Sequence, residues 1–215
     1  MNTHLPADAN PIKLFRNPKS GHSHRAELML ALLDIPYETI DLDMTNGAHK
    51  APEYLKISPF GQVPAIDDNG VTLSDSNGII AYLGERYGDT DEWIGKDPIE
   101  KGQVQRWLSV AAGEIFAGPC CARLVTVFGA PFDHAACIAK SHALFEVMEK
   151  HLGGKSFLVA ERLTLADVAG YSYIAHAPEG GVSLDAYPNI RNWLGNVEAQ
   201  PRFVAMASSP IPAAA

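Results

Sequence analysis

The spacing of hydrophobic residues changes about halfway along the 215-residue chain. Up to residue 88, short apolar or alternating runs typical of strands are interleaved with patterns of helical period, whereas beyond residue 98 the period is helical throughout. The segments expected in the first part are strands at 12–15, 37–42, 63–66 and 71–73, and helices at 23–33, 51–57 and 76–87. Asp67-Asp68-Asn69-Gly70, between the last two strands, is a turn sequence that suits an antiparallel hairpin. The predicted order is therefore βαβ, then a helix, then ββα.

The second part of the chain predicts helices only. Apolar residues recur at helical spacing in four segments: 104–115, 120–128, 138–152 and 190–197. Gly118-Pro119 should kink or stop the first of these before the second continues it. Thr164-Leu165-Ala166-Asp167 reads as a capping box with Asp in place of Glu, which fixes the start of a further helix from Leu165 to about His176. We expect an α/β domain at 11–88, a polar linker at 89–98 and an all-helical domain at 99–209.

Composition and charge exclude several classes of protein. Hydrophobic residues make up 47% and charged residues 20% of the chain, which is ordinary for a compact soluble protein. The net charge of −8 argues against a nucleic-acid partner, because such partners require an excess of basic residues. The three cysteines have no framework spacing and the N-terminus has no signal segment, so a cytoplasmic location is expected. No stretch approaches the ~20 consecutive apolar residues of a membrane span, so no membrane association is expected.

One window of the acidic first half is basic. No carboxylate occurs between Asp8 and Glu27, and four cations do: Lys13, Arg16, Lys19 and Arg25. The window is either a chance cluster on a solvated surface or a local positive field for an anionic ligand. His22 and His24 in the same window could form half of a metal site, but no carboxylate or cysteine is obviously paired with them, so no metal is expected.

Four motifs in this layout together resemble the cytosolic glutathione transferases. They are Asn17-Pro18-Lys19-Ser20-Gly21, the segment from Pro52 to Pro64 that ends in Pro59-Phe60-Gly61-Gln62-Val63-Pro64, Leu73-Ser74-Asp75-Ser76 and Leu163-Thr164-Leu165-Ala166-Asp167. Each is weak alone, but all four in order, spread over nearly the whole chain, are specific. The resemblance implies a thioredoxin-like N-terminal domain followed by an all-helical bundle, glutathione as the co-substrate, and a homodimer.

The resemblance also implies how glutathione is held at its cysteinyl and glycine parts. In this family the proline at the position of Pro64 is cis, and the backbone of the preceding residue, here Val63, pairs with the cysteinyl part as an added strand would. His49 and Gln62 stand where family members bind the glycine carboxylate, and both side chains can donate to it. His49 as an ordinary surface residue is the alternative.

Asp75-Ser76 is expected at the γ-glutamyl end of glutathione. The hydroxyl and the first amides of the helix suit the carboxylate, while Asp75 can pair with the ammonium. The family's usual pair is Glu-Ser, and the shorter Asp leaves the reach of that ion pair open. An ordinary N-cap is a compatible interpretation.

Catalysis in this family requires an ionised glutathione thiol. A thiol with a pKa near 8.5 is only a few per cent ionised at pH 7, and one charge-assisted hydrogen bond of ~1.5–3 kcal/mol is enough to ionise most of it. Ser20 resembles the catalytic serine of the serine-type classes. Ser23 is the alternative, since it stands nearer the helix start and could equally be the N-cap. Phe15 occupies the position of the tyrosine-type nucleophile activator, and the loop has no cysteine, so those two routes are disfavoured.

The electrophile pocket is expected in the helical domain. The resemblance implies that Val110, Phe116 and Cys120 line it, although Cys120-Cys121 could be a redox pair or, more typically, small packing residues. The expected function is conjugation of the glutathione thiolate to small hydrophobic electrophiles. The alternatives are a glutathione-binding carrier with little transferase activity, and a glutathione-dependent isomerase, dehalogenase or peroxidase.

Overall fold

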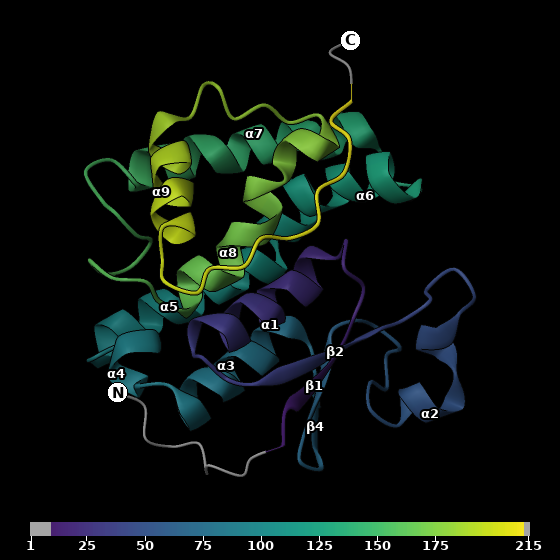
Figure 1. The fold of residues 1–215 in the computed structure, drawn as a ribbon. Coiled ribbons are helices and arrows are strands. Elements are labelled where there is room, and N and C mark those ends of the chain that lie inside the picture. The colour runs from purple at the N-terminus through teal and green to yellow at the C-terminus, as the bar shows by residue number, and fades with distance from the viewer. Residues whose placement is uncertain (1–9, 213–215) are drawn as a thin grey trace. The chain divides into compact units, whose positions relative to one another are not determined.

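The computed structural model describes residues 10–212, which fall into two compact units. The first unit consists of the chain up to Ile94 together with Pro201–Ala207, and the second of Gly95–Gln200 with the residues from Ser208 onward. Figure 1 follows the chain through both units by colour. Each unit is described below by itself.

A four-stranded sheet forms the centre of the first unit. Its strands are β1 (Ile12–Arg16), β2 (Tyr37–Asp41), β3 (Ala65–Asp68) and β4 (Val71–Ser74), in the order β2-β1-β3-β4. β1 runs parallel to β2 and antiparallel to β3, and β3 and β4 form a hairpin. Asn69 and Gly70 make its two-residue turn with φ angles of 52° and 94°, which suits a tight hairpin of this kind. The sheet has the mixed topology that the sequence predicts.

Three helices of the first unit lie where the sequence predicts them: α1 (Gly21–Leu32), α2 (Pro52–Leu55), which follows a 3₁₀ turn at Ala48–Lys50, and α3 (Ser76–Tyr87). A further short helix, α4 (Thr90–Trp93), lies in the segment expected to be a linker. α1 and α3 pack against each other. Ala26 and Met29 of α1 and Ile79, Ile80 and Leu83 of α3 have no exposed surface, so the two helices contribute apolar side chains to the core of this unit. The predicted order βαβ, α, ββα is confirmed.

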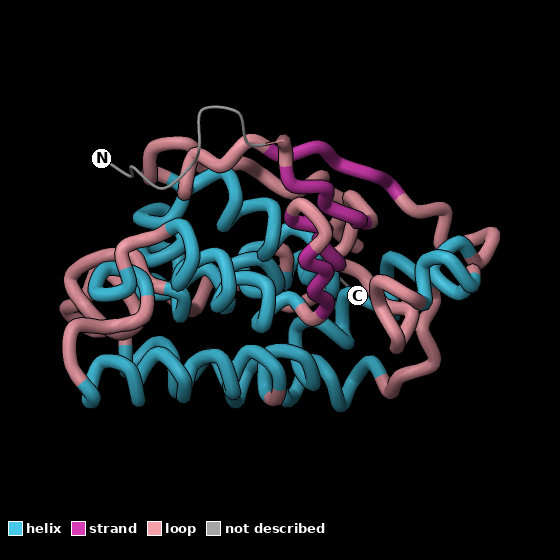
Figure 2. The backbone as a smooth tube through the Cα atoms, turned by 90° about the horizontal axis from the view of Figure 1, so that it is seen from below, coloured by secondary structure: helices cyan, strands magenta, loops and turns pink. Residues whose placement is uncertain are grey.

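All regular elements described in the second unit are helices, and the strands, magenta in Figure 2, all belong to the first unit. The second unit comprises α5 (Pro98–Ala112), a π-helical turn at Phe116–Cys120, α6 (Cys121–Phe128), α7 (His134–His151), α8 (Leu165–Ala175), a 3₁₀ turn at Ala177–Gly180 and α9 (Pro188–Glu198). The π turn contains Pro119, so the predicted interruption at Gly118-Pro119 is confirmed. A side chain at Gly118 would approach the backbone of Ser141 to 3.0 Å, which explains why glycine is needed where the turn contacts α7.

The predicted capping box forms at the start of α8, and Asp167 does more than cap the helix. Its carboxylate accepts hydrogen bonds from the backbone N–H of Thr164 at 2.9 Å, the N–H of Leu158 at 2.8 Å and the indole of Trp193 at 2.9 Å. Asp167 is completely buried, and this burial raises its pKa. The residue is therefore a fixed point between α8, α9 and the preceding loop.

The boundary between the units falls at residues 94 and 95, within the expected linker, and that linker carries α4 and the first residue of α5. In addition, Pro201–Ala207, expected in the helical domain, clusters with the first unit, and we call it the returning segment. His24 Nε2 donates to the carbonyl of Val204 at 2.8 Å, and Met206 is buried.

Among the described residues, one helical run is long and apolar enough to cross a membrane. It spans Pro98–Phe128, and its most apolar stretch has a mean hydropathy of 1.4 with 44% of its residues buried inside the fold. A single run of this kind is weak evidence for a membrane span, because the core helix of a soluble protein satisfies the same criterion.

Candidate functional site

The N-terminus of α1 separates the two candidate serines. Ser20 is the N-cap, with extended backbone angles of φ −89° and ψ 119°, and its Oγ accepts the N–H of Ser23 at 3.3 Å. Ser23 has no exposed surface, and its Oγ accepts the N–H of Asn17 at 3.2 Å. The interpretation of Ser23 as the N-cap is therefore wrong. Ser20 is half-buried, and a hydroxyl that accepts a hydrogen bond keeps its own proton to donate to another group.

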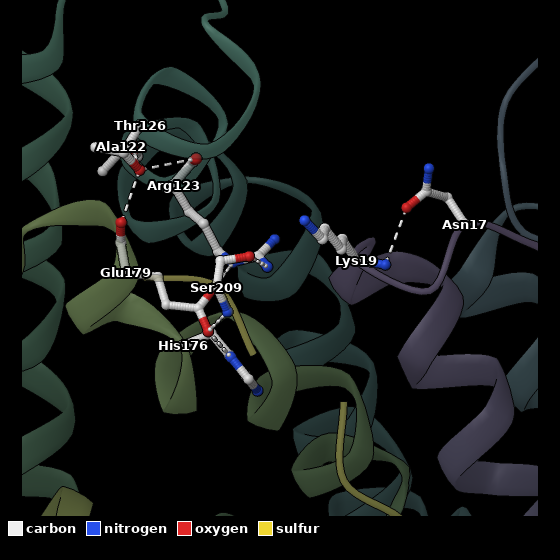
Figure 3. Close-up of polar contacts among 8 residues, drawn as sticks. All are labelled: Asn17, Lys19, Ala122, Arg123, Thr126, His176, Glu179 and Ser209. Carbon is white, nitrogen blue, oxygen red and sulfur yellow. Dashed lines mark hydrogen bonds and ion pairs between the residues drawn. The ribbon is translucent and has the colours of Figure 1, made fainter. Parts of the chain in front are cut away.

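The loop before α1 is held by its own side chains. Asn17 Oδ1 accepts the N–H of Lys19 at 2.9 Å (Figure 3), and Asn17 O accepts the N–H of Ser20 at 2.9 Å. Asparagine forms turns of this kind readily, and Pro18 restricts the same loop. The motif therefore fixes the Ser20 backbone before the helix begins.

Asp75 and Ser76 lie together at the start of α3. Asp75 is the N-cap at φ 73°, and its exposed carboxylate accepts the N–H of Gly78 at 2.9 Å. Ser76 is 3% exposed and its Oγ accepts a hydrogen bond from Arg25 Nη1 at 2.8 Å. The N-terminal end of this 12-residue helix carries partial positive charge, which suits an anion.

Arg25 and His22 of α1 reach the same point, and sequence reasoning did not place either of them there. Arg25 is 1% exposed, and its Nη1 also donates to Asn77 Oδ1 at 2.9 Å. His22 Nδ1 lies 3.3 Å from Ser76 Oγ and 3.5 Å from Arg25 Nη1. Burial and the charge of Arg25 lower the pKa of His22 to about 3, so its ring is neutral at pH 7. Because a guanidinium can only donate, the Nδ1 atom that faces it is the unprotonated acceptor.

The basic window is not an open positive patch. Arg16 forms ion pairs with Glu27 and with Asp41, the latter at 2.9 Å, and both carboxylates lie outside the window in sequence. Arg25 is buried, whereas Lys13 and Lys19 are exposed. The local field predicted from the sequence is therefore weaker than four free cations would give.

The two histidines of the window do not converge on a common point. His24 Nε2 bonds to the returning segment, and His22 Nδ1 lies beside Ser76. Within residues 10–212, no group of three or more His, Cys, Asp or Glu side chains is placed to hold a metal ion.

The Val63-Pro64 bond is cis, as the resemblance implied. Gln62 exposes its side chain, while its carbonyl accepts hydrogen bonds from Tyr54 Oη at 2.7 Å and Ser58 Oγ at 2.9 Å. Burial raises the pKa of Tyr54 to about 12, so its phenol remains a donor at all ordinary pH values. These two contacts fix the backbone that leads into the cis bond and leave the Gln62 amide exposed to solvent.

His49 lies in the 3₁₀ turn before α2, next to the same loop. Its Nδ1 is buried and has no hydrogen-bond partner in the described part of the chain. Lys50 Nζ donates to the carbonyls of Phe60 at 3.0 Å and Gly61 at 3.1 Å, which ties the two segments together. Gly61 has φ 57°, and a side chain there would meet His49 O at 2.6 Å. Glycine is thus required for the loop to pass His49 this closely.

The three predicted pocket residues have different environments in the helical unit. Val110 is half-buried on the wall of a cavity of about 550 Å³ between α5 and α7, which Trp107, Met148 and His151 also line. Phe116 is 39% exposed in the π turn. Cys120 is completely buried, which favours the alternative interpretation of a packing residue.

Comparison with known proteins assigns the family. Residues 10–85 match the model of the glutathione S-transferase N-terminal domain, and residues 133–201 match that of the C-terminal domain. The sheet order, the cis Val63-Pro64 bond and the helical second unit agree with this assignment. The chain belongs to the cytosolic glutathione S-transferase family.

Individual relatives agree over nearly the full chain. A probable glutathione S-transferase from Oryza sativa is 31% identical over 210 residues, covering 92% of this chain and 96% of the relative. A solved structure of a possible glutathione S-transferase from Rhodopseudomonas palustris superposes with a TM-score of 0.85 at 27% identity, covering 94% of this chain and 100% of that one. The glutathione S-transferase of Pseudomonas fluorescens gives a TM-score of 0.84 at 28% identity, with 92% and 99% covered. The protein is a glutathione transferase, and glutathione is its co-substrate.

Proposed function

We propose that the protein conjugates the thiolate of glutathione to small hydrophobic electrophiles, with Ser20 as the group that stabilises the thiolate. The observation that carries this proposal is the hydrogen-bonding state of Ser20. Its Oγ accepts the N–H of Ser23, so its proton is left to donate to a sulfur at the start of α1. Ser23 is the weaker candidate because its side chain has no exposed surface, whereas Ser20 is half-buried.

Glutathione would be held along its length by residues of the first unit. Its γ-glutamyl end is assigned to Asp75 and Ser76, its cysteinyl part to the Val63 backbone before Pro64, and its glycine carboxylate to Gln62 and His49. The exposed amide of Gln62 and the exposed carboxylate of Asp75 support these roles. The unpartnered Nδ1 of His49 is a further polar group near the same loop.

The second substrate is proposed to bind apolar side chains of the helical unit. Val110 and Phe116 keep the role that the sequence suggested, since both retain accessible surface. Cys120 is completely buried, so it is not proposed to contact the substrate. The proposed assembly is a homodimer in the cytoplasm, by analogy with the family, and light scattering should give twice the 23.2 kDa mass of one chain.

Substitution of Ser20 tests the proposed chemistry. We expect Ser20→Ala to lower kcat about 10- to 100-fold with an aryl halide as electrophile, which corresponds to the ~1.5–3 kcal/mol of one hydrogen bond to a charged group. The Kd of S-methylglutathione, which has no thiol, should change less than about threefold. Ser183→Ala, at an exposed loop position of the helical unit, is the matched control and should leave both values unchanged.

Three outcomes would contradict parts of this proposal. Full activity of Ser20→Ala with an inactive Ser23→Ala would exchange the two roles. Retention of glutathione without turnover of aryl halides, epoxides, isothiocyanates or hydroperoxides would favour the carrier. Turnover without net consumption of glutathione would favour an isomerase.

A further inference from the structure

The hydrogen bonds that Arg25 donates determine how the polar side chains at the N-terminus of α3 are oriented. A guanidinium can donate but cannot accept, so the 2.8 Å contact from Arg25 Nη1 occupies a lone pair of Ser76 Oγ. The 2.9 Å contact to Asn77 likewise assigns Oδ1 to the arginine, which turns the NH₂ branch of that amide away from it. Ser76 and Asn77, at the first turn of α3, are thus both held with their acceptor oxygens toward Arg25.

His22 provides an acceptor for the proton of the Ser76 hydroxyl. Its neutral Nδ1 lies 3.3 Å from Ser76 Oγ, so it is the acceptor available to the Ser76 proton before a ligand binds. A hydrogen bond between neutral groups contributes less than one to a charged group. A carboxylate bound at the helix N-terminus would therefore replace His22 as the acceptor of the hydrogen bond that the Ser76 hydroxyl donates.

We propose that Arg25 is a positioning residue for glutathione, which acts by holding Ser76 and Asn77 with their donors toward the γ-glutamyl carboxylate. The inference rests on the proposed function, because it assigns the ligand of that site. A carboxylate is an acceptor only, and it matches a surface made of a hydroxyl proton, an amide NH₂ and the first N–H groups of α3. Arg25 need not contact glutathione to have this effect, since it acts through two residues.

The length of the arginine side chain is the property to test. A lysine at position 25 keeps the positive charge but ends one bond short of the guanidinium Nη1, so it loses the reach to both acceptors. Arg25→Lys therefore separates the charge at this position from the orientation of Ser76 and Asn77. Arg86→Lys, in the last turn of the same helix α3 and mostly exposed, is the matched control.

The experiment is a double-mutant cycle on the binding of S-methylglutathione, measured by calorimetry. We expect Arg25→Lys to weaken Kd about tenfold, while kcat at saturating glutathione changes less than about threefold, because the sulfur end is untouched. In a Ser76→Ala background the same substitution should change Kd only about threefold, because only the contact to Asn77 remains to be lost. Arg86→Lys should bind as the wild-type protein does.

The outcomes separate this role from the function on which it rests. An unchanged Kd in a folded Arg25→Lys protein, or the full tenfold loss persisting without Ser76, would overturn the positioning role alone. Failure of the wild-type protein to bind S-methylglutathione would overturn the proposed function and this role together. If Arg25→Lys does not fold, Asn77→Leu supplies the second variant: it should weaken Kd at least threefold, and unaltered binding would refute the orientation of Asn77.

Discussion

The two units each bury an arginine, and the two arginines contact different kinds of partner. Arg123 in the helical unit is completely buried and donates from Nε to the carboxylate of Glu179 at 2.6 Å. Arg25 in the first unit is 1% exposed and donates to a hydroxyl and an amide oxygen. A carboxylate partner neutralises the charge of the arginine. Neutral acceptor groups leave that charge in place and are oriented by the guanidinium that donates to them.

The cluster around Glu179 occupies both oxygens of that carboxylate. Oε2 accepts from Arg123, and Oε1 accepts from His176 Nδ1 at 2.6 Å and from the N–H of Ser209 at 2.9 Å (Figure 3). Burial opposes ionisation of Glu179, but the hydrogen bonds from His176, Ser209 and Arg123 lower its pKa overall. We therefore expect this cluster to serve stability, whereas the role proposed for the cluster around Ser76 is binding.

The largest effect is expected from breaking the helical cluster. Glu179→Gln removes the charge that Arg123 faces, and loss of one partner of a buried ion pair costs about 3–5 kcal/mol. Urea unfolding should show this loss, while the folded variant should keep the wild-type Kd for S-methylglutathione. The exposed Glu161→Gln is the matched control and should stay within about 0.5 kcal/mol of wild type. A loss below 1 kcal/mol for Glu179→Gln would contradict the structural role.

A smaller effect should appear as a pH dependence that belongs to His22. Its pKa is about 3 in the folded protein and 6.5 when unfolded, so the unfolded chain binds more protons between these values. The contribution of neutral His22 to the free energy of unfolding is complete above pH 6.5 and is lost as the pH falls toward 3. Between pH 7 and pH 4 the wild-type protein should lose about 2–3 kcal/mol more unfolding free energy than His22→Gln does.

The control for this pH dependence is another histidine substitution. His134→Gln, in the helical unit, should follow the wild-type curve between pH 7 and pH 4. Parallel curves for the wild-type protein and His22→Gln would show that His22 ionises freely in the folded state. The environment of His22 in the cluster around Ser76 would then not contribute to the pH dependence of the unfolding free energy.

The smallest effect is expected at Lys19. Since Arg16 is paired and Arg25 is buried, Lys19 is the exposed cation nearest Ser20 in sequence, and reversing an exposed charge changes anion capture only modestly. Lys19→Glu should raise the KM for glutathione about two- to threefold at low ionic strength, and added salt should remove the difference. Lys155→Glu in the helical unit is the matched control. A salt-independent KM in the wild-type protein would indicate that the basic window is a chance cluster of charges on a solvated surface.

Local signals predicted the fold well. The hairpin turn at Asn69-Gly70, the capping box at Thr164 and the break at Pro119 each depend on residues within a few positions, and all three are confirmed. The environment of Arg25 was missed because it depends on contacts 51 and 52 residues away. The neutralisation of Arg16 was missed for the same reason, since Asp41 reaches it through the pairing of β1 with β2.

The sequence predicts which residues form the candidate site, but not the hydrogen bonds and burial that the structure gives them. The motif around Ser20 offered two serines, and only the backbone angles at Ser20 show which of them is the cap. The cluster of Arg123, Glu179 and His176 carries no local pattern, because it joins α6, a 3₁₀ turn and the C-terminal residues.

The returning segment has a consequence for how the chain is made. Because Pro201–Ala207 belongs to the first unit, that unit is interrupted by more than a hundred residues of the second. During synthesis, the carbonyl of Val204 cannot reach His24 until all of Gly95–Gln200 and Val204 itself have been translated. The sheet and α1 therefore leave the ribosome first, yet the unit they form is completed only after most of the second unit has been made.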